Sequence, residues 1–146
     1  MSGTAVLTKI LDIREKEKKD AQIAYRKSVD TFEEVATELF ELLRKKEAVE
    51  TSYEEALTSS MHLNFIQDQL AYIETLETKI TELQKKVSLA RTNMETKQQV
   101  LSDAHVETKK FEKIIEFRTS EELDRVKKAE DSFMNEISIQ QYLSHR

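Results

Sequence analysis

Residues 66–94 read IQDQLAYIETLETKITELQKKVSLARTNM, and this stretch decides the fold. Its apolar side chains recur in steps of three and four, the spacing of seam positions in a heptad repeat. The rhythm holds without a slip over residues 66–115, and a second series with the same rhythm spans residues 7–56. The pattern predicts two long amphipathic helices that pack against each other as a coiled coil.

A break in this rhythm separates the two series at the triplet Thr58-Ser59-Ser60. Short hydroxyl side chains compete for backbone hydrogen bonds and cap a new helix. We therefore expect helix 1 over about residues 4–57, a turn at about 58–62 and helix 2 over about 63–138. Long helices joined by a short loop lie antiparallel, and a turn centred near residues 59–60 makes the numbers of facing residues sum to about 119. The predicted fold is all-α: a single antiparallel coiled-coil hairpin over residues 1–146, with the second helix longer.

The longer second helix has a C-terminal overhang in this prediction. Leu7 would face about residue 112, so residues from about 113 onward have no partner in helix 1. The overhang is amphipathic, and an apolar face without an intramolecular partner is either disordered or reserved for another protein. We interpret it as a partner-binding segment. The residues that would carry the contact are Leu123, Val126, Phe133, Ile137 and Tyr142.

The composition excludes most other classes of protein. One glycine, no proline and no cysteine leave few tight turns, no disulfide scaffold, no thiol nucleophile and no glycine-rich phosphate loop. The net charge of −5 is spread along the chain, so no basic face predicts nucleic-acid binding. His62, His105 and His145 are too far apart to converge on a metal. A two-helix hairpin also lacks a deep pocket for catalysis. We predict a protein that is not an enzyme and takes no cofactor, metal or small-molecule substrate.

The two remaining local features concern location and the hairpin tip. The N-terminus shows no signal peptide and no window approaches a membrane span, which predicts a soluble protein unless a partner holds it at a membrane. Residues 56–67, at the tip, contain no charged side chain although about a third of the chain is charged. Either these apolar residues only close the hairpin, or Met61, Leu63 and Phe65 form a small docking surface.

Three segments together resemble the FliJ family, a cytoplasmic component of the bacterial flagellar type III export apparatus. Residues 7–18 read LTKILDIREKEK, similar to the apolar and charged start of family members. Residues 72–80 and 107–113 are similar to segments of the family's second helix, and residues 131–143 to the close of its Gram-positive branch. The order of these segments, the length and the hairpin position carry the resemblance.

The resemblance implies a function as well as a fold. Family members look like the two-helix coiled coil of the F1-ATPase gamma subunit. They are thought to insert their open end into the hexameric ring of the export ATPase, to contact the membrane export gate and to cycle export chaperones. This implies a position at the cytoplasmic face of the membrane at the flagellar base. Carried over by position, the ring contact would involve Leu7, Ile10, Leu11, Arg14, Lys110, Phe111, Ile114, Ile115 and Arg118. The gate contact would involve Tyr72 and Leu76, although Leu76 is also a seam position.

A protein of another class could share this pattern. A coiled-coil structural protein or a holdase-type chaperone would use the same hairpin to dimerise or to hold clients at its uncharged tip. The two hypotheses differ in whether the hairpin is a monomer that stimulates an export ATPase.

Overall fold

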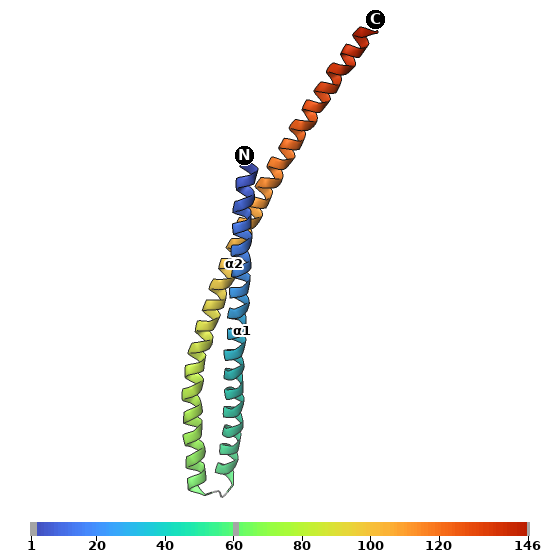
Figure 1. Ribbon diagram of the computed structural model, residues 1–146. Helices are drawn as coiled ribbons and strands as arrows, with labels where there is room; N and C mark the ends of the chain where they lie inside the picture. Colours follow the sequence, from blue (N-terminus) through green and yellow to red (C-terminus); the bar gives the residue numbers. More distant parts are fainter. Residues whose placement is uncertain (1–2, 60–61, 146) are drawn as a thin grey trace. The chain divides into compact units, whose positions relative to one another are not determined.

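The chain forms two long helices, which confirms the predicted all-α hairpin (Figure 1). The structure is a computed structural model that describes residues 3–59 and 62–145. Helix α1 spans Gly3–Thr58 and helix α2 spans Leu63–Ser144, so the second helix is the longer. Helix α2 continues past the predicted end near residue 138. Within the described residues no cis peptide and no positive φ occurs, as expected for two helices without proline.

The hydroxyl triplet ends the first helix. The side chains of Thr58 and Ser59 both donate hydrogen bonds to the carbonyl oxygen of Glu55, at 3.0 and 2.9 Å. The same carbonyl oxygen also accepts the backbone N–H of Ser59 at 3.0 Å, so both hydroxyl groups add to a helical hydrogen bond at the end of α1. Helix α2 begins after His62, whose carbonyl oxygen accepts the N–H of Ile66. The third hydroxyl of the triplet, at Ser60, lies outside the described residues.

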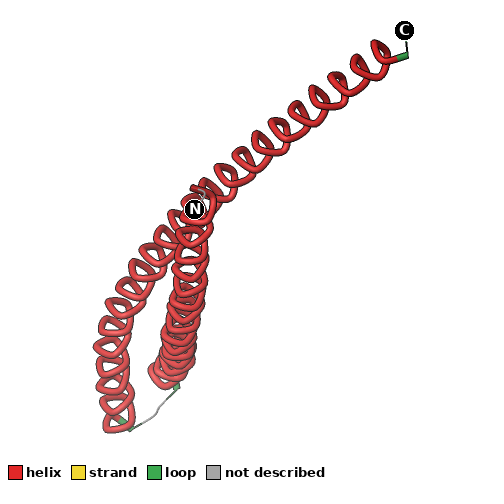
Figure 2. Tube along the Cα trace, turned by 45° about the horizontal axis from the view of Figure 1, so that its top comes forward, coloured by secondary structure: helices red, strands yellow, loops and turns green. Residues whose placement is uncertain are grey.

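The chain divides into two compact units, each containing a part of both helices. Unit 2 comprises Asp20–Leu101 and contains the turn. In this unit α2 runs back beside α1, as both views show (Figures 1 and 2). The best-buried run of apolar side chains lies on α2 of this unit. It consists of Ile73, Leu76, Ile80, Leu83 and Val87, each at most 9% exposed.

The predicted seam is correct, but the predicted pairing across it is wrong by three residues. Every position of both series is buried or half-buried. Contacts in unit 2 join Lys46 to Glu77 and Phe32 to Arg91, two pairs whose numbers each sum to 123. The seam positions of the two helices face each other at the neighbouring sum of 122 rather than 119. Phe32, expected beside Val87, therefore faces residues one turn further along α2.

Unit 1 comprises Met1–Lys19 and Ser102–Arg146. The first turns of α1 pack here against α2, with Thr108 of α2 in contact with Arg14 of α1. A Cβ added to Gly3 would lie 2.8 Å from Nη1 of Arg118, so α1 begins beside Arg118. The part of α2 without a facing helix therefore starts at about residue 119 instead of 113. We call residues 119–145 the overhang.

Candidate docking site at the open end of the hairpin

A polar layer joins the two helices of unit 1 at Arg14 and Thr108. The Thr108 residue is only 2% exposed. Its hydroxyl lies 2.8 Å from the carbonyl oxygen of Ala104 and 3.3 Å from that of Arg14. One hydroxyl hydrogen serves both acceptors, so the shorter bond within α2 is the stronger one. The small side chain of Thr108 allows the backbone of α1 to approach α2 closely at this layer.

The Arg14 side chain braces the same layer from the side. Its guanidinium carbon lies 5.7 Å from the centre of the Phe111 ring, and its Nη1 lies 3.1 Å from a carboxylate oxygen of Glu17. Its buried Nε has no hydrogen-bond acceptor among the described residues. The stem thus fills the seam while the charged end reaches solvent. A cation over an exposed aromatic ring contributes about 0.5–1 kcal/mol, and an exposed ion pair about 0–1 kcal/mol.

The nine predicted ring-contact residues fall into two groups in the structure. One group is half-buried in or beside the seam between the helices and consists of Leu7, Ile10, Leu11, Arg14, Phe111 and Ile115. The other group faces solvent on α2 and consists of Lys110, Ile114 and Arg118. Only the second group is fully available to another protein while the hairpin is closed. The first group holds the two helices of unit 1 together.

Four exposed apolar residues in the paired part of unit 1 are not among the predicted contact residues. Val6 and Ile13, one heptad apart on α1, are 53% and 56% exposed. Val106 and Phe117 on α2 are 57% and 64% exposed. A helix that exposes large apolar side chains in this way has a surface suited to protein contact. The signal that could have found them is an apolar residue outside the heptad series, in a stretch where the seam is already complete.

The overhang is helical up to Ser144, and its predicted contact residues lie on that helix. Leu123, Val126 and Phe133 are 65%, 50% and 62% exposed, and Ile137 is half-buried. Tyr142 is 68% exposed. Four of these side chains recur at helical spacing and form one stripe along the helix: Leu123, Val126, Phe133 and Ile137. This stripe lies beyond Gly3, the first described residue of α1, and no described residue of α1 faces it.

The structure separates the two residues of the predicted gate contact. Tyr72 is 42% exposed, whereas Leu76 is 1% exposed in the core of unit 2. With the hairpin closed, Leu76 is therefore unavailable to a partner. Phe65 lies one heptad before Tyr72 on the same face of α2 and is 37% exposed. An accessible aromatic pair on this face consists of Phe65 and Tyr72.

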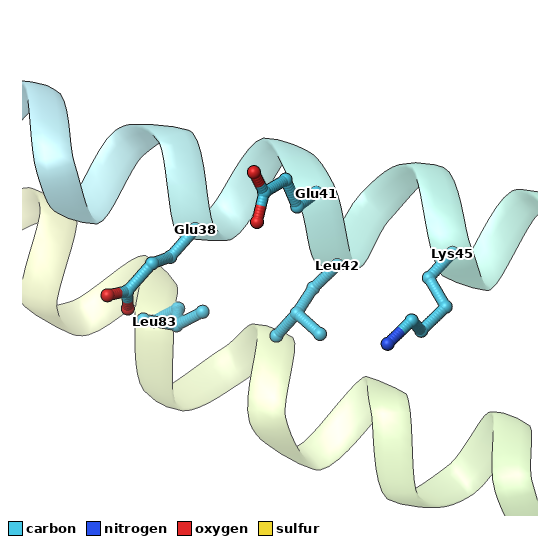
Figure 3. Close-up of a pocket in the computed structure, with 5 residues that line it drawn as sticks. All are labelled: Glu38, Glu41, Leu42, Lys45 and Leu83. Atoms are coloured by element: carbon cyan, nitrogen blue, oxygen red, sulfur yellow. The ribbon is translucent and has the colours of Figure 1, made fainter.

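A shallow groove crosses the seam of unit 2 (Figure 3). Leu42 of α1 and Leu83 of α2 form its apolar floor, and Glu38, Glu41 and Lys45 line one side. The three charged side chains belong to residues that are exposed to solvent. The groove therefore contains no desolvated charged group of the kind that catalysis in a pocket requires.

Two absences among the described residues bear on metals and membranes. No group of three or more His, Cys, Asp or Glu side chains within residues 3–59 and 62–145 converges as a metal site would. Neither helix, as far as the structure describes it, contains a segment long and apolar enough to cross a membrane.

Comparison with known proteins decides the family. The family model of the flagellar FliJ protein matches residues 4–146 of the chain. The chain belongs to the FliJ family. A flagellar FliJ protein from Bacillus subtilis (strain 168) is 35% identical to it over 135 residues, covering 92% of each chain. No solved structure gives a significant match.

Membership in the FliJ family confirms the resemblance seen in the sequence. It makes the chain a component of the flagellar protein export apparatus, in a family whose members are non-enzymatic. For a member of this family, the surface residues of unit 1 and of the overhang are candidates for protein contacts rather than for chemistry.

Proposed function

We propose that this chain is a central-stalk-like component of flagellar export whose open end docks into the ring of the export ATPase. It performs no chemistry itself and acts by stabilising one conformation of the ring over another. The surface of unit 1 carries the proposal. There the seam at Arg14 and Thr108 holds the two helices together. The exposed apolar residues are Val6 and Ile13 on α1 and Ile114 and Phe117 on α2.

The decisive experiment measures ATP hydrolysis by the cognate export ATPase with and without the purified chain. We expect the chain to raise the rate and Ile13→Asp to reduce this stimulation, because Ile13 is 56% exposed on α1 of unit 1. Ile23→Asp is the matched control, since Ile23 is 58% exposed on the same helix in unit 2. Equal stimulation by both variants, or no stimulation by the wild type, would contradict the proposal.

Two truncations divide the open end further. A chain ending at Arg118 keeps the paired helices of unit 1 and loses only the overhang. A chain ending at Lys113 also loses Ile115 of the seam and the exposed Ile114 and Phe117. We expect the chain that ends at Lys113 to give no stimulation of the ATPase. Phe65→Asp, at the hairpin tip, should leave it unchanged.

The proposal includes a link to the membrane export gate through the exposed face of α2 near the turn. Tyr72→Asp should weaken binding to the cytoplasmic part of the gate protein in a direct binding assay. Leu70→Asp is the matched control, since Leu70 is 43% exposed and Tyr72 is 42% exposed. Such a link would hold the chain at the cytoplasmic face of the membrane. Cycling of export chaperones is a further part of the proposal, and competition between chaperone and ATPase for the chain tests it.

A holdase-type chaperone or a dimeric structural protein is the second candidate function, favoured by the hairpin tip. Ala56 is buried there, but Leu57 and Leu63 are 55% and 66% exposed within the uncharged stretch. Met61, the third tip residue considered, lies outside the described residues. Under this alternative, Leu63→Asp should reduce protection of an aggregating export substrate without changing ATPase stimulation. A tight homodimer in light scattering, together with no effect on the ATPase, would favour the alternative.

A further inference from the structure

The overhang has its own heptad seam, distinct from the seam that faces α1. The hairpin series reaches residue 115, and its next positions would be Arg118, Glu122 and Arg125, all of them exposed. A new series begins in the overhang, with Glu130 at its central position and four apolar residues at the others: Leu123, Val126, Phe133 and Ile137. These five residues again follow steps of three and four. We call them the overhang seam. The remaining large apolar residues lie off this series: Met134, Ile139, Tyr142 and Leu143.

The change of rhythm falls where α1 begins. Between Ile115 and Leu123 the series contains two consecutive steps of four, a discontinuity that locally unwinds a coiled coil and rotates its seam. Gly3 lies beside Arg118, within this interval. The hairpin seam thus stops where its partner helix stops, and a new seam starts immediately beyond. This is the pattern expected of a helix that takes two different partners in succession.

The charges around the overhang seam indicate what kind of helix covers it. Glu130 occupies a central seam position, and Glu122 and Glu136 flank the seam on one side by heptad position. A second copy of the chain in parallel register would place Glu130 against Glu130. In an antiparallel pair whose seams face each other, Glu130 would lie against Val126 or Phe133. A carboxylate facing another carboxylate or an apolar side chain is unfavourable in a seam, so the overhang is not suited to pair with itself.

We propose that the overhang is a helix-docking segment that binds one amphipathic helix of another protein, with a lysine or arginine facing Glu130. The inference rests on the proposed partner-binding role of the open end and adds the chemistry of the partner. The apolar residues of the overhang seam supply the contact area. Glu130 supplies selectivity, because a seam charge is tolerated only opposite a complementary one.

Synthetic helical peptides test this directly on the full-length chain. Each peptide is about three heptads long, with leucine at the seam positions. One carries lysine opposite Glu130, and its matched control carries glutamate there. The chain contains no tryptophan, so a single tryptophan in the peptide reports binding by fluorescence. We expect the lysine peptide to bind at least about tenfold more tightly, and Glu130→Lys to reverse the preference.

Two further variants show whether the peptide binds the proposed face. Phe133→Asp should abolish binding, because Phe133 is a seam residue that is 62% exposed. Ile139→Asp should bind as the wild type does, because Ile139 is 59% exposed but lies off the seam. Circular dichroism verifies that both variants remain helical. A chain ending at Arg118 should not bind either peptide.

Several results would overturn the inference. They are failure of both peptides to bind, equal binding of the two peptides, loss of binding with Ile139→Asp, or continued binding to the chain ending at Arg118. The ATPase assay keeps this test separate from the proposed function. If the peptides discriminate as expected while the chain leaves the export ATPase unchanged, the ATPase proposal fails and the helix-docking segment stands.

Discussion

Leu76 lies where two expectations about this chain compete, and Leu76→Ala separates them. As a seam residue it should stabilise the hairpin, whereas as a gate contact it should be exposed and contribute little. It is 1% exposed and belongs to a run of five buried seam residues on α2. Truncating a buried leucine to alanine costs about 2–5 kcal/mol. A seam one layer thick relaxes more readily than a globular core, so we expect about 2–3 kcal/mol.

The loss is measurable by far-UV circular dichroism during urea and thermal unfolding, since the chain has no tryptophan for fluorescence. A chain of this length changes its melting temperature by roughly 2–4 °C per kcal/mol, so the melting temperature should fall by about 4–12 °C. Tyr72→Ala, at a site 42% exposed, should change the free energy of unfolding by no more than about 0.5 kcal/mol. Unchanged stability of Leu76→Ala would refute the burial of Leu76 and restore it as an accessible contact.

Three further predictions concern the seam. Lys46→Leu should raise the free energy of unfolding, measured by urea, by about 0.5–1 kcal/mol, because burial of leucine outweighs two ion pairs whose side chains are partly exposed. Cysteines at Leu39 and Leu83, whose numbers sum to 122, should form a disulfide readily in this cysteine-free chain, and those at Leu39 and Ile80 should not; equal yields on a non-reducing gel would contradict the register. Thr108→Val should change stability by less than about 1 kcal/mol in urea unfolding, because both carbonyl groups near its hydroxyl keep their helical donors.

The seam could be predicted from the sequence, but its register could not be taken from the turn residues. Periodicity identifies inward positions because a helix returns the same face every three to four residues. The register was inferred from the hydroxyl triplet as the centre of the turn. The hydroxyl groups of Thr58 and Ser59 instead donate hydrogen bonds to the carbonyl oxygen of Glu55 at the end of α1. A stricter criterion was present in the sequence. Requiring every seam residue of one helix to face a seam residue of the other gives a sum of 122 throughout both series.

The candidate site was less predictable than the fold for a physical reason. Seam periodicity shows which residues point inward, but it does not show which of the outward residues contact a partner. Ile13 and Phe117 lie outside the heptad series, and their exposure in the structure marks them as contact candidates. Leu76 shows the opposite case. The seam pattern already placed it in the core, and position-by-position transfer from the family placed it at a partner surface.

The distribution of burial along the seam bears on how such a protein can bind partners and remain folded. In unit 2 five successive seam residues of α2, from Ile73 to Val87, are buried and apolar. In unit 1 the described residue with the greatest burial is Thr108, whose layer is completed by the charged Arg14. Segments with few buried apolar contacts open at lower free energy than the well-packed ones. The free energy that holds the hairpin together is therefore concentrated in unit 2, which leaves the helices of unit 1 able to adjust to a partner without loss of the fold.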